Sequence, residues 1–257
     1  MNAPALELDG VTKAFGGVRA VDGVSFQIPV GSLSALIGPN GSGKTTLFNL
    51  VTNLYRHDSG VIRLFGRTMS DAADWQIARL GVVRTFQTAR VFPGMTAFEN
   101  VLAGAHLHLR SGALSAMLWL RSSRRQERAL AQRAQELLDL VGLAAFRDSA
   151  ATDLPMGAQK LLEVVRALMA RPKLLLLDEP AAGLNDGETA ELAMLLRAVR
   201  VSGVTVLVVE HNMSLVMGVA DRVIVLDAGT VVAEGPPAEI QRNPRVIEAY
   251  IGQQGSG

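Results

Sequence analysis

A glycine-rich stretch near the start of the chain has the residue types and spacing that bind phosphate. Residues 38–45 read Gly-Pro-Asn-Gly-Ser-Gly-Lys-Thr and fit the pattern G-x-x-x-x-G-K-S/T at every fixed position. Glycines let backbone N–H groups converge on phosphate oxygens, because a side chain there would block the approach. Lys44 can reach the terminal phosphates of a nucleotide, and the Thr45 hydroxyl can bind Mg²⁺. The alternative, a glycine-rich turn that binds nothing, does not explain why a predicted strand precedes the stretch and a predicted helix follows it.

Two adjacent acids supply the second half of such a site. Asp178 and Glu179 follow the apolar run 174–177, which is typical of a buried parallel strand. At the end of that strand, Asp178 would hold Mg²⁺ through water, and Glu179 would orient or deprotonate the attacking water. Adjacent acids can also be solvated loop residues, but the phosphate-binding pattern upstream favours the catalytic interpretation.

Two further polar residues follow predicted strands and are ambiguous by themselves. His211 comes directly after VTVLVVE (204–210), a predicted buried strand, where it could cap the strand or contact a terminal phosphate. The other parts of the site favour the phosphate contact. Gln87 ends the stretch VVRTFQ and is uninformative alone.

The elements that must position these residues alternate between strands and helices. Residues 5–31 predict two or three antiparallel strands. Alternating strands and helices in the second half indicate a parallel α/β sheet. The remaining predicted strands are 32–38, an edge strand over 60–66, the end of 75–87, 174–178, 204–211, and a hairpin over 222–235 that turns at 227–229. The predicted helices follow residue 43 and cover 161–170, 188–200 and 214–220.

The pattern changes from about Met95. Residues 98–147 are mostly helical by pattern and contain no proline. The stretch from position 110 to 133 contains several arginines but only one acid, Glu127. Two interpretations remain: a solvated helical face or a contact with lipid headgroups. These arginines are Arg110, Arg121, Arg124, Arg125, Arg128 and Arg133.

Composition limits the classes that fit. The 257 residues suffice for one large domain, or for a core with a smaller lobe. A net charge of +1 gives no electrostatic reason to expect nucleic acid, and the lack of cysteine excludes disulfides and thiolate metal sites. No apolar run approaches the ~18 residues that span a bilayer, and the stretch MNAPALELDG is not a secretory signal, so we expect a cytoplasmic protein. The mean hydropathy of +0.25 fits either a partner interface or a very aliphatic core.

Taken together, these residues resemble the ATP-binding subunit of ABC transporters over nearly the whole chain. GPNGSGKTT is similar to its Walker A motif, LLLLDEP to its Walker B motif, and GLND at 183–186 to its D-loop. The resemblance implies ATP and Mg²⁺ as cofactors. It implies Lys44, Gln87, Glu179 and His211 as catalytic residues, and Thr45, Gln87 and Asp178 as metal ligands. The implied nucleotide contacts are Phe15, which would stack on adenine, with Pro39, Asn40, Gly41, Ser42, Gly43, Lys44, Thr45 and Thr46.

The resemblance also implies a fold. It is an α/β, P-loop NTPase core with a parallel sheet, an N-terminal antiparallel β subdomain and an inserted α-helical lobe. Residues 5–250 would form a single nucleotide-binding domain, with 5–94 and 171–250 as the core and 95–170 as the lobe. The tail 251–257 is expected to be flexible.

A narrower similarity points to the branched-chain amino acid importer group. It rests on IARLGVVRTFQTARVFPGMTAFENVL, DEPAAGLN, EHNMSLVMGVADRVIVLDAGTVVAEG and NPRVIEAYIG. It implies ATP-driven uptake of branched-chain amino acids or a related small solute, at the cytoplasmic face of the inner membrane. The implied partners are a second ATPase subunit, transmembrane permease subunits and, indirectly, a solute-binding protein, with no nucleic acid. Rival interpretations are a soluble ABC ATPase that acts on nucleic acid or the ribosome, an exporter subunit, and a regulatory subunit that binds ATP without hydrolysing it.

Apolar residues after Gln87 predict a groove for a helix of the permease, with core packing as the competing interpretation. They are Val91, Phe92, Met95 and Phe98, within the stretch 90–98.

The stretch DLPMGAQK departs from the family pattern. ABC ATPases carry a signature loop, usually L-S-G-G-Q, that binds the ATP held by the opposite subunit. Here Leu154, Gly157 and Gln159 fit, but Pro155 replaces the serine and Met156 replaces the first glycine. Ala158 follows the second glycine. Proline has neither a hydroxyl nor an N–H group, so either this loop is weak and the working unit is a heterodimer, or the departure is tolerated and a homodimer works.

Overall fold

The computed structural model describes residues 3–69, 74–85, 91–105 and 121–251. The chain divides into two compact units, each described here by itself. The first comprises Met1–Gln87, Lys173–Ala182 and Leu196–Gly257, and the second comprises Thr88–Pro172 and Gly183–Leu195. No helix of the described residues is long and apolar enough to cross a membrane.

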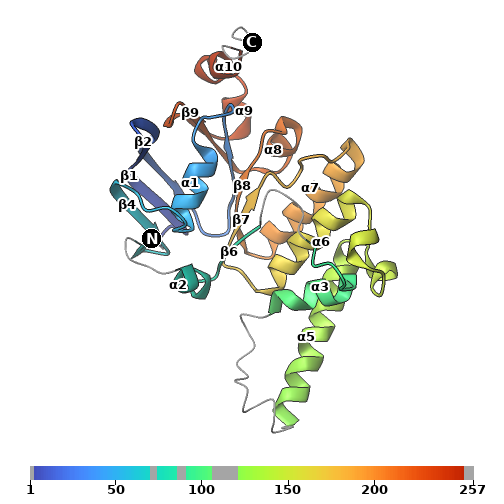
Figure 1. The fold of residues 1–257 in the computed structure, drawn as a ribbon. Coiled ribbons are helices and arrows are strands. Elements are labelled where there is room, and N and C mark those ends of the chain that lie inside the picture. The colour runs from blue at the N-terminus through green and yellow to red at the C-terminus, as the bar shows by residue number, and fades with distance from the viewer. Residues whose placement is uncertain (1–2, 70–73, 86–90, 106–120, 252–257) are drawn as a thin grey trace. The chain divides into compact units, whose positions relative to one another are not determined.

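The first unit contains a six-stranded sheet (Figure 1). Its strand order is β10-β9-β3-β8-β7-β6, and all neighbours are parallel except the β9–β10 pair. The three strands β3, β7 and β8 are buried along their whole length, because their runs of Leu, Val and Ile are apolar on both faces. The strand bounds are β3 (Leu33–Ile37), β6 (Val82–Arg84), β7 (Leu174–Asp178), β8 (Thr205–Val209), β9 (Arg222–Asp227) and β10 (Thr230–Gly235).

The same unit holds an antiparallel sheet of order β2-β1-β4-β5. Its strands are β1 (Leu6–Phe15), β2 (Val18–Ile28), β4 (Ser59–Leu64) and β5 (Arg67–Thr68). The prediction that residues 60–66 form an edge strand is wrong, since β4 pairs with β1 on one side and β5 on the other. The strand β5 has only two residues, too few for an alternating pattern in the sequence, and it reaches β4 through left-handed turn residues at Phe65 and Gly66.

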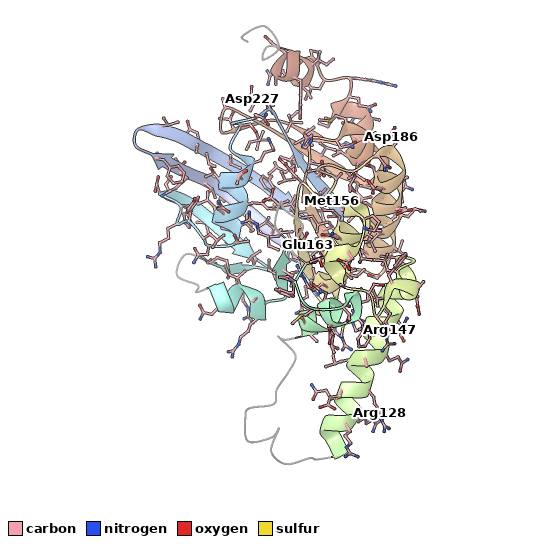
Figure 2. The ribbon with its side chains drawn as sticks, turned by 45° about the vertical axis from the view of Figure 1, so that its right-hand side comes forward. Arg128, Arg147, Met156, Glu163, Asp186 and Asp227 are labelled. Atoms are coloured by element: carbon pink, nitrogen blue, oxygen red, sulfur yellow. The ribbon has the colours of Figure 1, made fainter. Side chains whose placement is uncertain are left out.

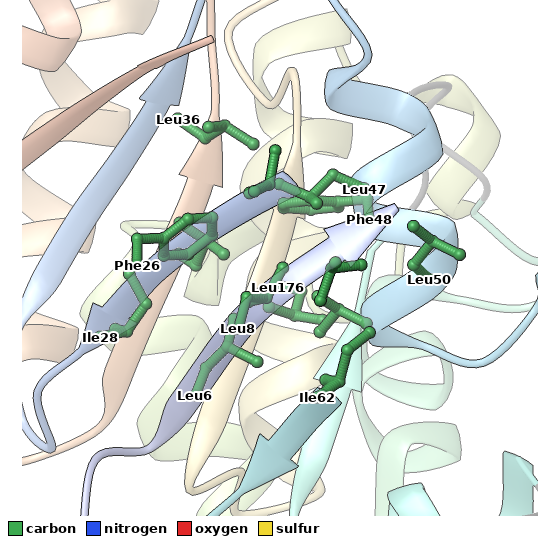
Figure 3. Close-up of a cluster of buried hydrophobic side chains, with 14 of the residues drawn as sticks. Leu6, Leu8, Phe26, Ile28, Leu36, Leu47, Phe48, Leu50, Ile62 and Leu176 are labelled. Carbon is green, nitrogen blue, oxygen red and sulfur yellow. The ribbon is translucent and has the colours of Figure 1, made fainter. Parts of the chain in front are cut away.

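Helix α1 (Lys44–Val51) fills the space between these sheets (Figure 3). Leu47, Phe48 and Leu50 of α1 form one buried cluster with side chains of both sheets. Leu6, Leu8 and Ile62 come from the antiparallel sheet, and Leu36 and Leu176 from the parallel one. Packing on both sides fixes the start of α1 relative to the end of β3.

Further helices surround the sheets of the first unit. They are α2 (Asp74–Arg79), α8 (Met213–Val219), α9 (Pro237–Ile240) and α10 (Pro244–Ile251). The predicted hairpin at 222–235 is confirmed as β9 and β10, with Ala228 and Gly229 in left-handed conformations at the turn.

The second unit is helical. Helix α3 (Ala97–Ala103) packs on α5 (Arg121–Leu140) and on α6 (Met156–Met169). Thr96 and Glu99 form a capping box that starts α3, and Gly104 lies so close to α6 that a Cβ would meet the Arg166 carbonyl oxygen at 2.0 Å. Two 3₁₀ turns, Ala144–Phe146 and Ala151–Asp153, lead into α6. Helix α7 (Asp186–Val201) starts in this unit and ends in the first.

Mostly helical structure over 98–147 was predicted and is confirmed in the described parts of that range, while residues 106–120 lie outside them. The predicted fold class is confirmed as well: a parallel sheet behind a glycine loop, an N-terminal antiparallel sheet and a set of helices.

Candidate nucleotide site

The glycine loop joins the end of β3 to the start of α1. Gly38, Gly41 and Gly43 all have φ in the left-handed region, at 154°, 78° and 103°. A Cβ on Gly38 would lie 2.0 Å from the Leu226 carbonyl oxygen, and one on Gly43 would lie 2.2 Å from that of Ala20. Glycine is therefore required at both positions for the backbone to fold against β9 and β2.

Lys44 extends back along this loop. Its Nζ donates hydrogen bonds to the carbonyl oxygens of Gly38 (2.7 Å) and Pro39 (2.9 Å), and to Ser42 Oγ (3.4 Å). The side chain is buried, and this burial lowers the pKa of Lys44, while Glu179 and Asp178 act in the opposite direction. A largely desolvated cation held by neutral carbonyls is a favourable partner for an incoming phosphate.

A cavity of about 320 Å³ opens over the loop. Most of the predicted nucleotide contacts meet in it: Asn40, Gly41, Ser42, Gly43, Lys44, Thr45 and Thr46 line the cavity, together with Glu179 and Ala20. Ala20 was not predicted, and a small apolar residue in a strand gives no signal for it. Pro39 takes part through its carbonyl bond to Lys44 rather than as a lining residue.

Asp178 closes β7 and is buried. Its Oδ2 accepts a hydrogen bond from Arg84 Nη2 at 2.8 Å in a partly buried ion pair. Arg84 also donates to Asn49 Oδ1 (2.7 Å) and lies over the Phe48 ring, so it connects Asp178 to α1. Sequence reasoning missed Arg84, because the pairing of β6 beside β7 is not visible in the sequence.

Glu179 takes a left-handed backbone conformation, with φ of 47°. Its N–H donates to the Val209 carbonyl oxygen (2.9 Å), and its carboxylate Oε2 lies 3.9 Å from Nδ1 of His211. The structure therefore brings Glu179 and His211 together, and it places Glu179 in the wall of the cavity. A non-glycine residue in this conformation is held by its surroundings, which is common where a side chain must be aimed.

Glu210 ties the two strand ends to each other and was also missed. It is fully buried, and its carboxylate accepts hydrogen bonds from three backbone N–H groups. These belong to Ala181 (2.7 Å), His211 (3.0 Å) and Asn212 (3.1 Å). An acid at the end of the apolar run 204–209 was the available signal, and it indicates a structural anchor for the loops that carry Glu179 and His211.

Phe15 lies at the exposed end of β1, with 45% of its surface accessible. It makes an edge-on contact with Tyr55 (5.4 Å between centroids), and Lys13 Nζ lies 5.4 Å from its ring. Asp58 holds this strand end by accepting hydrogen bonds from Lys13 Nζ and from the Ala14 N–H, both at 2.7 Å. Phe15 is not among the residues that line the cavity.

The signature-loop residues lie in the second unit, at the start of α6; Met156 is labelled in Figure 2. Pro155 is the N-cap and provides no side-chain hydrogen bond, while Met156 is 55% exposed. Leu154 and Gly157 are buried, Ala158 is half-buried, and Gln159 donates to the Leu154 carbonyl oxygen (2.8 Å). The N-cap position of α6 therefore has no capping hydroxyl in the structure, as the proline at position 155 predicts.

Gln87, predicted as a catalytic residue and metal ligand, lies outside the described residues. Of the predicted groove residues, Phe92 and Met95 are exposed, and Val91 and Phe98 are half-buried. Phe92 lies under the Arg166 guanidinium at 4.7 Å, and the buried Asn100 accepts a hydrogen bond from its N–H (2.7 Å).

A parallel sheet whose glycine loop opens a helix, with an acid at the end of another strand of the same sheet, defines a P-loop nucleotide-binding cassette. The family described as ABC transporter matches residues 21–182, and one described as branched-chain amino acid ATP-binding cassette transporter matches residues 230–255. The chain belongs to the ABC transporter family of ATP-binding proteins.

Named relatives match over almost the whole chain. BraF of Pseudomonas aeruginosa, a high-affinity branched-chain amino acid transport ATP-binding protein, is 44% identical over 254 residues, covering 98% of this chain and 100% of BraF. LivG of Escherichia coli (strain K12), which carries the same description, is 42% identical over 254 residues with the same coverage.

Solved structures show the same fold. An ATP-binding cassette of an ABC transporter in its ADP conformation matches with a TM-score of 0.83 and 30% identity, over 97% of this chain and 99% of that one. A dimeric cassette in a post-hydrolysis state, bound to ADP and phosphate, matches with a TM-score of 0.74 and 26% identity, over 90% of this chain and 98% of the other.

Proposed function

We propose that this chain is the ATP-hydrolysing subunit of a membrane importer for branched-chain amino acids or a related small solute. The observation that carries the proposal is the cavity in which Lys44, Thr45 and the loop backbone face Glu179. The importer class rests on relatives named as branched-chain amino acid transport proteins that match the chain from end to end.

ATP binding follows from the chemistry of the loop. The backbone amides of the loop and the N-terminus of α1 present partial positive charge to phosphate oxygens. Lys44, which bonds to carbonyl oxygens within its own loop, would exchange them for oxygens of the terminal phosphates. The exposed ring of Phe15 would stack on adenine.

Oxygen donors at the site fit Mg²⁺. Thr45, which carries a hydroxyl, lines the cavity, and Asp178 ends β7. Mg²⁺ binds to one or two such protein groups, with water and phosphate completing its shell. Thr45 and Asp178 would hold the ion, with Gln87 as the third proposed ligand. When bound, the ion would neutralise negative charge on the phosphates.

Hydrolysis would depend on Glu179. Glu179 lines the cavity, and its carboxylate can accept a proton from water. His211 Nδ1 lies 3.9 Å from this carboxylate. We assign Glu179 the role of orienting or deprotonating the attacking water, and His211 the role of contacting the terminal phosphate.

The working unit would be a dimer of ATPase subunits on transmembrane permease subunits, at the cytoplasmic face of the membrane, fed indirectly by a solute-binding protein. A related cassette forms dimers with ADP and phosphate. Because Pro155 and Met156 cannot supply the hydroxyl and the flexible backbone of a full signature loop, we favour a heterodimer in which the partner supplies an intact one.

The experiment that tests this function is phosphate release by the full chain, with its partner subunit, before and after the change Glu179→Gln. We expect the variant to bind ATP and to lose turnover by on the order of 100-fold or more, as for other positioned acid–base groups. Glu188→Gln is a matched control, because Glu188 lies outside the cavity and bonds to the Asn185 N–H. Native turnover in Glu179→Gln would show that the base is assigned wrongly.

A further inference from the structure

Helix α10, labelled in Figure 1, contacts β10 and borders an apolar cavity next to the glycine loop. The cavity has a volume of about 360 Å³ and is lined by Val246 and Tyr250 of α10 and by Ile37, the last residue of β3. Helices α8 and α9 complete its wall, with Met213, Met217 and Ile240. Because Ile37 directly precedes Gly38, this packing places the C-terminal helix beside the point where the glycine loop begins.

Tyr250 brings a polar group into this apolar packing. The residue is half-buried, but its hydroxyl oxygen is shielded from solvent and makes no hydrogen bond of good geometry within the described residues. Burial raises the pKa of Tyr250 to about 12, and the backbone of Gly38 acts in the opposite direction, so the hydroxyl lies next to Gly38 and keeps its proton at neutral pH. A buried hydroxyl with an incomplete hydrogen bond costs stability that a phenylalanine would avoid. The hydroxyl therefore needs an explanation other than the packing of α10.

Gly38 connects this hydroxyl to the phosphate-binding groups. The residue has little freedom to move, because its Cα lies so close to β9 that a Cβ would meet the Leu226 carbonyl oxygen at 2.0 Å. Its own carbonyl oxygen accepts the 2.7 Å hydrogen bond from Lys44 Nζ. A group that holds the backbone of Gly38 in place therefore also holds the carbonyl that Lys44 must leave when phosphate arrives.

We propose that Tyr250 is a positioning residue for the glycine loop, and that its hydroxyl holds the backbone of Gly38 in the conformation that receives the phosphates of ATP. The apolar packing of α10 fixes the phenol ring, and the ring presents its hydroxyl to Gly38. A loop that is already ordered loses less entropy when it binds, so the hydroxyl acts on ATP affinity rather than on the chemical step. The inference rests on the proposed function in one respect, namely that the glycine loop binds ATP.

The change Tyr250→Phe tests the proposal, because it removes the hydroxyl and keeps the ring. We expect the affinity of the full chain for Mg²⁺–ATP, measured by calorimetry, to fall about 2- to 10-fold, the effect of losing one hydrogen bond. Phosphate release at saturating ATP, measured with the partner subunit, should stay at the parental rate. The melting temperature should be unchanged or slightly raised, because a hydroxyl with an incomplete hydrogen bond is no longer buried. A purely structural role would instead lower it.

A matched control changes the same helix and cavity without touching a polar group. Ile247 of α10 also lines the cavity, and Ile247→Val removes one methylene from its wall. This control should lower the melting temperature slightly and bind Mg²⁺–ATP as the parent does.

Parental ATP affinity in Tyr250→Phe would overturn the inference. An equal loss of affinity in Ile247→Val would also overturn it, because the packing of α10 and not the hydroxyl would then set the loop. A third contrary result is a loss of affinity in Tyr250→Phe that comes with a lower melting temperature and a lower saturated rate, since that is general destabilisation. If the parent itself fails to bind Mg²⁺–ATP, the proposed function fails as well, so the parental titration separates the two.

Discussion

At the scale of single residues, the ion pair of Arg84 with Asp178 supports the site from a position that the sequence did not reveal. Asp178 is buried, the Arg84 side chain is only 11% exposed, and the pair measures 2.8 Å. We predict that Arg84→Gln destabilises the fold by about 3 kcal/mol, because an unpaired carboxylate remains buried. Thermal or urea unfolding measures this loss. Arg63→Gln is a suitable control, since its pair with Glu7 is more exposed and should cost at most ~1 kcal/mol.

A further consequence concerns Mg²⁺. Asp178 loses its orienting partner in Arg84→Gln, so the ATPase of the variant should need a higher Mg²⁺ concentration for half-maximal rate. An unchanged Mg²⁺ dependence together with an unchanged unfolding free energy would mean that Arg84 does not hold Asp178 in place.

Asp58 gives a prediction about pH at the end of β1. The hydrogen bond from Lys13, and then that from the Ala14 N–H, lower the pKa of Asp58 below its ordinary value of 3.8. The unfolded chain then binds this proton more readily than the folded chain, so the stabilisation is complete above about pH 4 and is lost as pH falls through the lowered pKa.

The matched comparison is Asp58→Asn. Its unfolding midpoint should lie below that of the parent at neutral pH, and the difference should shrink on acidification toward pH 3. A constant difference across this range would show that ionised Asp58 does not stabilise the strand end that presents Phe15.

At the scale of elements, the approach of α3 to α6 depends on Gly104. Its Cβ would meet the Arg166 carbonyl oxygen at 2.0 Å and Met169 Cβ at 2.9 Å. We predict that Gly104→Ala lowers the unfolding free energy by about 1–3 kcal/mol, because backbone atoms must move apart. In Gly218→Ala the new methyl group meets only the tip of Arg197, at 3.5 Å. This control should be neutral or slightly stabilising in unfolding experiments, and similar losses in both variants would contradict the packing argument.

Elements were predictable where the sequence carries an unambiguous local pattern. The apolar runs of β7 and β8, the glycine loop and the β9–β10 hairpin were all identified by their own residues. The order of strands in the sheet was not predictable from the sequence. The residues next to Asp178 were therefore missed. Arg84 reaches that carboxylate only because β6 is the strand beside β7, and this pairing joins residues about ninety positions apart.

Buried polar contacts were the second kind of failure. Glu210 looks in the sequence like one more acid after an apolar strand, yet it bonds to three backbone N–H groups and anchors two loops. The prediction that β4 lies at the edge of its sheet was wrong for a different reason, because β5, the strand that pairs with it, has only two residues. The residues of the candidate site could thus be predicted from the sequence, but the residues that hold them in place were found only in the structure.

At the scale of the whole molecule, the signature loop decides what the chain does alone. We predict that the isolated chain hydrolyses ATP at least ~10-fold more slowly than it does with its partner subunit, since Pro155 offers no hydroxyl or N–H group. The double change Pro155→Ser, Met156→Gly should raise the activity of the isolated chain. Steady-state phosphate release at low protein concentration measures both.

A control for that experiment changes exposed residues away from the loop. Met194 and Val201 are exposed on α7, and their replacement by serine should not raise the activity of the isolated chain. Full activity of the unmodified chain without a partner would remove the case for a heterodimer.

Calorimetry of Mg²⁺–ATP binding to the full chain, before and after Lys44→Ala, shows whether the glycine loop is the phosphate site. We expect the parent to bind and its affinity to fall by on the order of 10- to 100-fold in the variant, the effect of losing a charged hydrogen-bond donor to phosphate. Lys173→Ala, on an exposed lysine outside the cavity, should bind as the parent does. Undiminished ATP binding by Lys44→Ala would contradict the assignment of the glycine loop as the phosphate site.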